Sequence, residues 1–369
     1  MTPLAQLSAA GVAVWLDDLG RHRLASGQLA ELVATHHVVG VTSNPTIFAA
    51  AIGDGSDYAT DLSRLARQGA SPEAAVRELT TSDVRAACDV LADVHRATAG
   101  RDGRVSLEVD PRLAADAAGT VRQAAELSVV VDRPNLFVKI PATPEGLPAI
   151  TETLGAGIAV NVTLIFSLSR YEQVIDAWLA GLELAARNGH DLARLDSVAS
   201  FFVSRMDTAV DALLDADGST AAAELRGRAA LANARLAYER YEQMLSGDRW
   251  ATLRDLGARS QRPLWASTGT KDARYDDTRY VTGLVAPDTV NTMPHATLLA
   301  MADHGSVTGD TVRGGYDDAR AVLAALAELG IDYDAVVDQL ETDGVVAFQQ
   351  AWDRLLESVT AALSRASGG

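Results

Sequence analysis

Leu136-Phe137-Val138-Lys139-Ile140 is a short run in which apolar residues follow one another without alternation. Strands that are covered on both faces, as in a parallel sheet, have this pattern, whereas strands with one solvent face alternate between apolar and polar residues. The chain contains eight runs of this kind, and most of them are followed by a helical pattern. Eight such units predict an α/β fold of the (β/α)8 TIM-barrel class. The seven further runs are Val12–Leu16, Val38–Thr42, Val105–Val109, Ile158–Thr163, Val198–Val203, Pro263–Thr268 and Thr289–Thr292.

The chain has no Pro/Ser-rich linker that would divide it, so residues 1–369 are predicted to form a single barrel domain rather than two domains. Additional helices are expected between the strands at about 46–103 and 206–262, and in a C-terminal helical region at about 311–365. The barrel is therefore expected to be elaborated by helices in three places.

Two helices can be placed more closely. Ser169 and Glu172 have the spacing of a capping box, which predicts a helix start at Ser169. Gly344–Ser364 carries apolar residues at helical spacing and is predicted to end the chain as a docked helix. The sequence leaves open whether this last helix covers the mouth of the barrel or forms an interface.

Charge and composition exclude several classes of function. The formal net charge of −17 opposes binding to nucleic acid or to anionic lipid. Cys88 is the only cysteine and has no partner for a disulfide, as is usual in a reducing compartment. Met1–Trp15 has no basic patch leading into a long apolar block, and no apolar run reaches the roughly 18 residues needed to span a bilayer. We therefore expect a cytoplasmic protein that binds neither nucleic acid nor membrane.

Lys139 is the most unusual residue of the predicted strands. A lysine between Val138 and Ile140 in a buried strand must either find a carboxylate or lose its proton. The first possibility is a structural salt bridge, and the second is a reactive amine. In a barrel, reactive groups come from the carboxyl ends of the strands, where Glu108 and Asp17 also lie. This setting favours a catalytic amine that forms a Schiff base, which requires the neutral form of lysine. Because a carboxylate in direct contact would stabilise the ammonium, we predict that Glu108 acts through a bridging water rather than in an ion pair.

Five motifs, in order along the chain, resemble those of the transaldolase family. They are Val14-Trp15-Leu16-Asp17-Asp18-Leu19, Gly40-Val41-Thr42-Ser43-Asn44-Pro45-Thr46, Val105-Ser106-Leu107-Glu108-Val109-Asp110, Val138-Lys139-Ile140-Pro141 and Asn161-Val162-Thr163-Leu164-Ile165-Phe166-Ser167. The resemblance implies a Schiff base on Lys139, a catalytic water held by Glu108 and Thr163, and proton transfer by Asp17. Asp18, next to Asp17, is instead expected to be a loop or helix-start carboxylate.

The same resemblance implies how a substrate would be held. Thr42, Asn44 and Asn161 lie in motifs that would bind its hydroxyl groups near the carbonyl end. The segment Ser200-Phe201-Phe202-Val203-Ser204-Arg205 is similar to the family's serine and phosphate-binding arginine. The second phosphate arginine of the family has no counterpart, and Lys271 stands at about its place as a point charge. Taken alone, Arg205 and Lys271 would be ordinary surface charges.

The resemblance implies transfer of a dihydroxyacetone unit from a ketose phosphate, sedoheptulose 7-phosphate or fructose 6-phosphate, to an aldose phosphate, glyceraldehyde 3-phosphate or erythrose 4-phosphate. No metal is expected, since the seven histidines show neither an H-x-H nor an HExxH spacing. No organic cofactor is expected either, because the protonated imine serves as the electron sink. Two alternatives remain open: a same-fold aldolase that releases free dihydroxyacetone, and a non-catalytic barrel that binds a ligand. A monomer and a homodimer are both compatible with the sequence.

Overall fold

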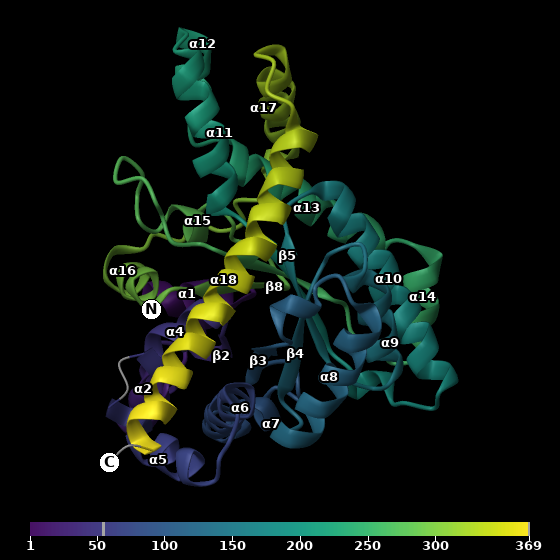
Figure 1. Ribbon diagram of the computed structural model, residues 1–369. Coiled ribbons are helices and arrows are strands. Elements are labelled where there is room, and N and C mark those ends of the chain that lie inside the picture. The colour runs from purple at the N-terminus through teal and green to yellow at the C-terminus, as the bar shows by residue number, and fades with distance from the viewer. Residues whose placement is uncertain (54–55, 368–369) are drawn as a thin grey trace.

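The computed structural model describes residues 1–53 and 56–367. Its centre is a closed barrel in which eight parallel strands follow one another in sequence order, which confirms the predicted (β/α)8 class (Figure 1). Each predicted run forms a strand, with bounds that differ by at most two residues. The strands are β1 (Val12–Asp17), β2 (Val38–Thr42), β3 (Arg104–Glu108), β4 (Leu136–Pro141), β5 (Val160–Ile165), β6 (Ser197–Phe202), β7 (Arg262–Ala266) and β8 (Thr289–Met293).

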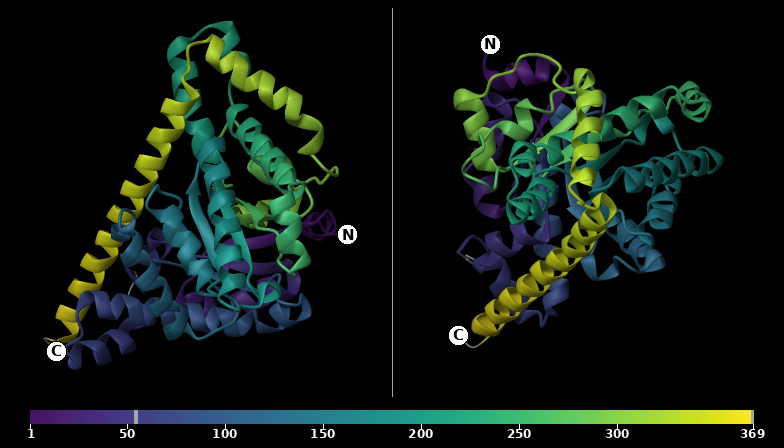
Figure 2. Two further views of the ribbon diagram at one scale, coloured as in Figure 1. Left: turned by 90° about the vertical axis from the view of Figure 1, so that its right-hand side faces the viewer. Right: turned by 90° about the horizontal axis from the view of Figure 1, so that it is seen from above.

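Helices connect the strands and surround the barrel (Figures 1 and 2). Before β3 they are α1 (Pro3–Ala9), α2 (Arg21–Ala25), α3 (Gln28–Thr35), α4 (Pro45–Gly53), α5 (Ala59–Arg67), α6 (Pro72–Val90) and α7 (Ala92–Ala97). Between β3 and β7 they are α8 (Ala117–Val131), α9 (Gly146–Gly155), α10 (Leu168–Arg187), α11 (Ser204–Asp217), α12 (Thr220–Leu225), α13 (Ala229–Leu245) and α14 (Asp248–Asp255). The remainder are α15 (Arg279–Thr282), α16 (His295–His304), α17 (Tyr316–Glu328) and α18 (Tyr333–Ser367). Short 3-10 turns lie at η1 (Ser56–Tyr58), η2 (Pro111–Leu113), η3 (Leu192–Arg194) and η4 (Arg313–Gly315).

The C-terminal helix α18 is longer than the sequence predicts. It begins at Tyr333, eleven residues before Gly344, and continues through that glycine without a break. It packs against α11 at one end and against α4, α5 and α6 at the other, and it also touches β5 and η2. Figure 1 shows it as the long yellow helix that crosses the molecule. The 3-10 turn η2 follows the carboxyl end of β3, and Gly344 of α18 lies beside Leu164 at the carboxyl end of β5. The helix α18 therefore lies over the mouth of the barrel.

The start of α10 also differs from the prediction. The N-cap is Ser167, whose backbone is extended and whose hydroxyl accepts a hydrogen bond from the Arg170 amide at 2.9 Å. Ser169 is exposed and lies inside the first turn. Ser169 is followed three residues later by Glu172, whereas Ser167 is followed at that distance by Arg170, so the capping-box pattern placed the start two residues late.

The core lies inside the barrel and between the barrel and its helices. Trp15 of β1 is fully buried, and its indole fills the space beside Gly40 of β2, where a Cβ atom would come within 2.4 Å of the ring. Gly40 is therefore needed for this packing. No helix in residues 1–53 and 56–367 is both long and apolar enough to cross a membrane.

Candidate active site

Lys139 and Glu108 form a buried ion pair at the carboxyl end of the barrel. The two residues are register partners on the adjacent strands β3 and β4, so both side chains enter the barrel at the same level. Lys139 Nζ lies 2.7 Å from Glu108 Oε1, and the exposed fractions of the two side chains are 6% and 7%. The ammonium also donates to the Ser43 carbonyl at 3.1 Å. The prediction of a bridging water between them is wrong, because these neighbouring register positions bring the two charged groups into direct contact at 2.7 Å.

Burial changes the protonation of Glu108. Removal from water raises the pKa of this carboxyl from 4.5 to about 7, against the opposing charge of Lys139, and Asp17 adds a smaller upward contribution. A carboxyl group with this pKa changes easily between acid and base near neutral pH. Glu108 therefore meets the requirement for a group that both gives and takes protons.

Asp17 ends β1 and lies beside Thr42, its register partner on β2. Thr42 donates to Asp17 Oδ1 at 2.7 Å and is itself 2.6 Å from the Thr292 hydroxyl. Burial raises the pKa of Asp17, while the charge of Lys139 and the Thr42 hydrogen bond act in the opposite direction. Asp18 instead pairs with Arg23 of α2, as expected for a loop carboxylate.

Thr163 faces the Lys139–Glu108 pair from β5, and its hydroxyl is buried without a hydrogen-bond partner among the described residues. A space of about 10 Å³ separates these side chains, lined by Glu108, Lys139, Thr163, Val345 and Phe348 among others. About 10–15 Å³ is the least that holds one water molecule. The next residue, Leu164, has a left-handed backbone with φ 61°, and the β5–β6 register shifts between Val162 and Ile165. Such bulges re-aim side chains near functional sites.

Of the other predicted polar residues, Asn161 lies below the pocket, whereas Ser200 and Asn44 line it. Asn161 is fully buried below the pocket, where its amide donates to the Ser106 hydroxyl at 3.0 Å and its oxygen accepts from Ser200 at 2.7 Å. Ser200 itself lines the pocket above. Asn44 also lines the pocket, and its side-chain oxygen accepts from the Ile47 amide at 3.0 Å, inside the first turn of α4.

A pocket of about 240 Å³ opens above Lys139 and is lined by residues from most of the strands. Arg205 lies at its rim in the first turn of α11, with its guanidinium 5.3 Å from the centre of the Phe202 ring, and burial lowers its pKa. Lys271, in the loop after β7, is exposed at another edge. The sequence predictions that meet in this pocket are Asp17, Thr42, Asn44, Lys139, Ser200, Arg205 and Lys271.

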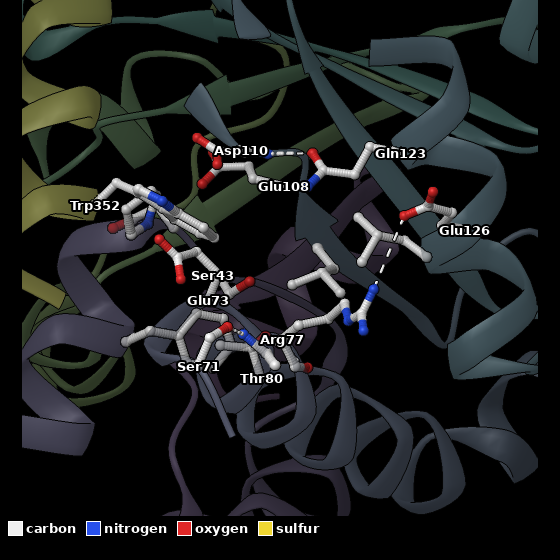
Figure 3. A pocket seen from close by; sticks show the side chains of 16 residues that line it. Ser43, Ser71, Glu73, Arg77, Thr80, Glu108, Asp110, Gln123, Glu126 and Trp352 are labelled. Atoms are coloured by element: carbon white, nitrogen blue, oxygen red, sulfur yellow. Dashed lines mark hydrogen bonds and ion pairs between the residues drawn. The ribbon is translucent and has the colours of Figure 1, made fainter. Parts of the chain in front are cut away.

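A second cavity, of about 290 Å³, reaches Glu108 from the side (Figure 3). It lies between α6 and α8 and has an apolar floor that includes Phe48, Leu107 and Leu127. Trp352 of α18 closes one end, beside Glu108, and Arg77 lies 4.0 Å from Glu126 at the other. Glu108 thus lines both this side cavity and the small space beside Lys139 and Thr163.

The sequence did not identify several residues of the pocket. Phe348, from α18, lies with its ring centre 5.9 Å from Lys139 Nζ, and Thr292 of β8 contacts Thr42. The other residues were selected because they lie at the carboxyl ends of strands, and the same reasoning would have selected Thr292. Phe348 had no such signal, because its position in an apolar helical stripe is that of ordinary core packing.

Comparisons with known proteins identify the family. The family model described as Transaldolase/Fructose-6-phosphate aldolase matches residues 14–359. The protein named Transaldolase 1 from Streptomyces coelicolor is 61% identical over 360 residues, covering 98% of this chain and 94% of its own. The transaldolase of Thermobifida fusca is 60% identical, covering 98% and 99% of the two chains, and that of Acidothermus cellulolyticus is 58% identical, covering 99% and 98%. The chain belongs to the transaldolase/fructose-6-phosphate aldolase family of enzymes.

Proposed function

We propose that this protein is a transaldolase, which transfers a dihydroxyacetone unit between sugar phosphates through a Schiff base on Lys139. The observation that carries the proposal is the buried Lys139–Glu108 pair beneath a pocket that has two cations, Arg205 and Lys271, at its edges. The names of relatives at about 60% identity over nearly the whole chain support the same activity.

The ion pair can supply the nucleophile. Transfer of one proton across the 2.7 Å contact converts the ammonium and the carboxylate into a neutral amine and a neutral acid. Burial favours this exchange, because two charges that have lost their hydration in a low-dielectric site are replaced by neutral groups. Lys139 then attacks the ketone carbon, and Glu108 returns a proton to the departing oxygen as water is lost.

The next step is cleavage of the adjacent C–C bond. Asp17 would take the proton of the hydroxyl group beside this bond, and because burial raises its pKa, its carboxylate is a stronger base than a solvated one. The protonated imine on Lys139 accepts the electron pair, so that an aldose phosphate leaves and a three-carbon enamine remains. Addition of the enamine to a second aldehyde reverses these steps. Water held between Glu108 and Thr163 would finally hydrolyse the imine.

Substrate binding divides between the two edges of the pocket. Thr42, Asn44 and Ser200 would hold hydroxyl groups near the carbonyl carbon, and Asn161 would act through its contact with Ser200. Arg205 would bind the phosphate with directed hydrogen bonds, and Lys271 would add a point charge. The donors would be sedoheptulose 7-phosphate or fructose 6-phosphate, the acceptors glyceraldehyde 3-phosphate or erythrose 4-phosphate, and the reaction would take place in the cytoplasm as part of the pentose phosphate pathway.

Trapping of the covalent intermediate tests the proposal. Borohydride reduction with fructose 6-phosphate present, followed by peptide mass mapping, should place a three-carbon adduct on Lys139. Lys139→Met should abolish both the adduct and the transfer of dihydroxyacetone to erythrose 4-phosphate. A folded protein that forms no adduct on any lysine would instead favour a non-catalytic barrel. Turnover unchanged in Lys139→Met would refute the Schiff-base assignment.

A further inference from the structure

The C-terminal helix brings one aromatic residue to the reaction centre from outside the barrel. Phe348 of α18 lies with its ring centre 5.9 Å from Lys139 Nζ and is 7% exposed. It lines both the larger pocket above Lys139 and the small space between Glu108 and Thr163. It is thus in contact with both places where water could approach the proposed Schiff base.

Contacts on both sides of Phe348 hold α18 in place. Arg170 binds Glu341 through Nε and Nη2, at 3.0 and 3.2 Å. The Gln349 amide donates to the Pro111 carbonyl at 3.3 Å. Between these contacts, Gly344 allows the helix backbone to approach closely, since a Cβ atom there would lie 3.2 Å from Leu164 Cδ2. The helix is therefore a fixed cover over β5 rather than a free end.

This cover limits the number of water molecules that fit beside Lys139. The space lined by Glu108, Lys139, Thr163 and Phe348 has a volume of about 10 Å³, about the least that one water requires. One turn further along α18, Trp352 closes the side cavity where it reaches Glu108 (Figure 3). Positions four apart lie on the same face of a helix, so one face of α18 closes both approaches to the Lys139–Glu108 pair.

We propose that Phe348 is a specificity-determining residue, which favours transfer of the three-carbon unit over its release by keeping all but one water molecule away from the enamine on Lys139. The inference rests on the proposed function. Its chemical basis is a competition for the same electron pair. The nucleophilic carbon of the enamine forms either a C–C bond to the acceptor aldehyde or a C–H bond to a proton supplied by water.

The release path balances without any further reactant. Protonation of the enamine carbon forms a C–H bond and gives an imine, and one water then cleaves the C=N bond to yield free dihydroxyacetone and the amine of Lys139. The water consumed here replaces the one lost when the imine formed. Additional water at the site would increase protonation of the enamine carbon, because water both supplies protons and solvates the charge of the imine that forms.

Substitution of Phe348 tests this role. The released fraction is the amount of free dihydroxyacetone divided by the glyceraldehyde 3-phosphate formed from fructose 6-phosphate, with erythrose 4-phosphate present as acceptor. Phe348→Ala should raise this fraction several-fold over the unsubstituted enzyme, and Phe348→Leu should raise it less. In D2O, the dihydroxyacetone released by the variants should carry one deuterium on carbon, which shows that release passed through protonation of the enamine carbon by an exchangeable proton.

Leu355→Ala is the matched control. Leu355 is fully buried on the same helix but lines neither cavity, so its substitution weakens the packing of α18 without opening the reaction centre. Its released fraction should stay at the unsubstituted value. An equal rise in Leu355→Ala and Phe348→Ala, or no rise in either, would overturn the inference. A lack of any borohydride adduct on Lys139 would instead refute the proposed function on which it rests.

Discussion

At the scale of single residues, the site depends on charges that are buried together. Glu108 and Lys139 are less than one-tenth exposed, and Asp17 lies close enough to change the pKa of Glu108. When ionisable side chains are buried together, the cost of burying each charge shifts their pKa values and decides which of them are protonated near neutral pH. The same cost should appear in the stability of the folded protein.

Glu108→Gln should remove one source of pH-dependent stability. Because the pKa of Glu108 is raised from 4.5 to about 7, the folded state holds more protons than the unfolded state between these pH values. The resulting stability is fully present below about pH 4.5 and is lost as the pH rises through about 7. Denaturant unfolding from pH 5 to pH 8 should therefore show a smaller fall in the free energy of unfolding for Glu108→Gln than for the unsubstituted protein.

Glu73→Gln provides the control, since Glu73 is an exposed carboxylate at the same side cavity. It removes a charge but no buried carboxyl group, so its curve should run parallel to that of the unsubstituted protein. If the Glu108→Gln curve were parallel as well, Glu108 would not titrate in this range.

Much of the site could be predicted at this scale, because polar residues at the ends of buried strands are exceptional. Lys139, Glu108 and Asp17 stand out for this reason, and the barrel brings them together. The direct contact of Lys139 and Glu108 depends on strand register, which the sequence does not specify. Phe348 could not be found, because a phenylalanine on an apolar helix face looks the same over a core and over a pocket.

At the scale of elements, strands were placed more accurately than helix ends. A strand that is buried on both faces is bounded on each side by polar or turn residues, whereas a helix start depends on which of several capping residues the backbone uses. At α10 the choice lay between Ser167 and Ser169. At α18, Gly344 suggested a boundary, but the helix continues, and the glycine lies where a Cβ atom would make tight contacts of 3.2 and 3.3 Å with Leu164 and Phe166.

Ser167→Ala should destabilise the protein, while Ser169→Ala should have little effect. The Ser167 hydroxyl accepts the Arg170 amide at 2.9 Å, and loss of such an N-cap costs about 1 kcal/mol. Ser169 is exposed, and its only side-chain contact among the described residues is with the Ser167 hydroxyl at 3.2 Å. The free energies of unfolding of the two variants, measured with the same denaturant, make the comparison. Equal losses in both would mean that the cap is shared.

At the scale of the whole molecule, the two ends of the barrel have different tasks. The pocket and its titrating groups lie at the carboxyl ends of the strands, where barrel enzymes have their active sites. The sequence predicted this arrangement because eight similar units in succession have few other ways to close. The amino ends carry a second buried cluster of charges, in which Asp196 lies between Arg101 and Arg104.

Asp196→Asn should lower stability without lowering activity. Asp196 and Arg104 are 0% and 1% exposed, and burial lowers the pKa of Arg104 to about 10. Removing the carboxylate leaves a buried guanidinium without its counter-charge, which costs about 3–5 kcal/mol. At about 2 °C per kcal/mol for a chain of this size, the melting temperature should fall by roughly 6–10 °C. Since the cluster lies at the opposite end of the barrel from Lys139, kcat/KM at 25 °C should not change.

Asp317→Asn is the reference for an exposed pair. Asp317 is 2.7 Å from Arg320 on α17, but its side chain is 99% exposed, so water screens the interaction and the melting temperature should stay within about 2 °C of the unsubstituted value. Circular dichroism melts of both variants, with transfer activity measured at 25 °C on the same samples, separate stability from catalysis. A loss of kcat/KM in Asp196→Asn at unchanged stability would show that the two ends of the barrel are coupled, because charge at the amino ends would then control the geometry around Lys139.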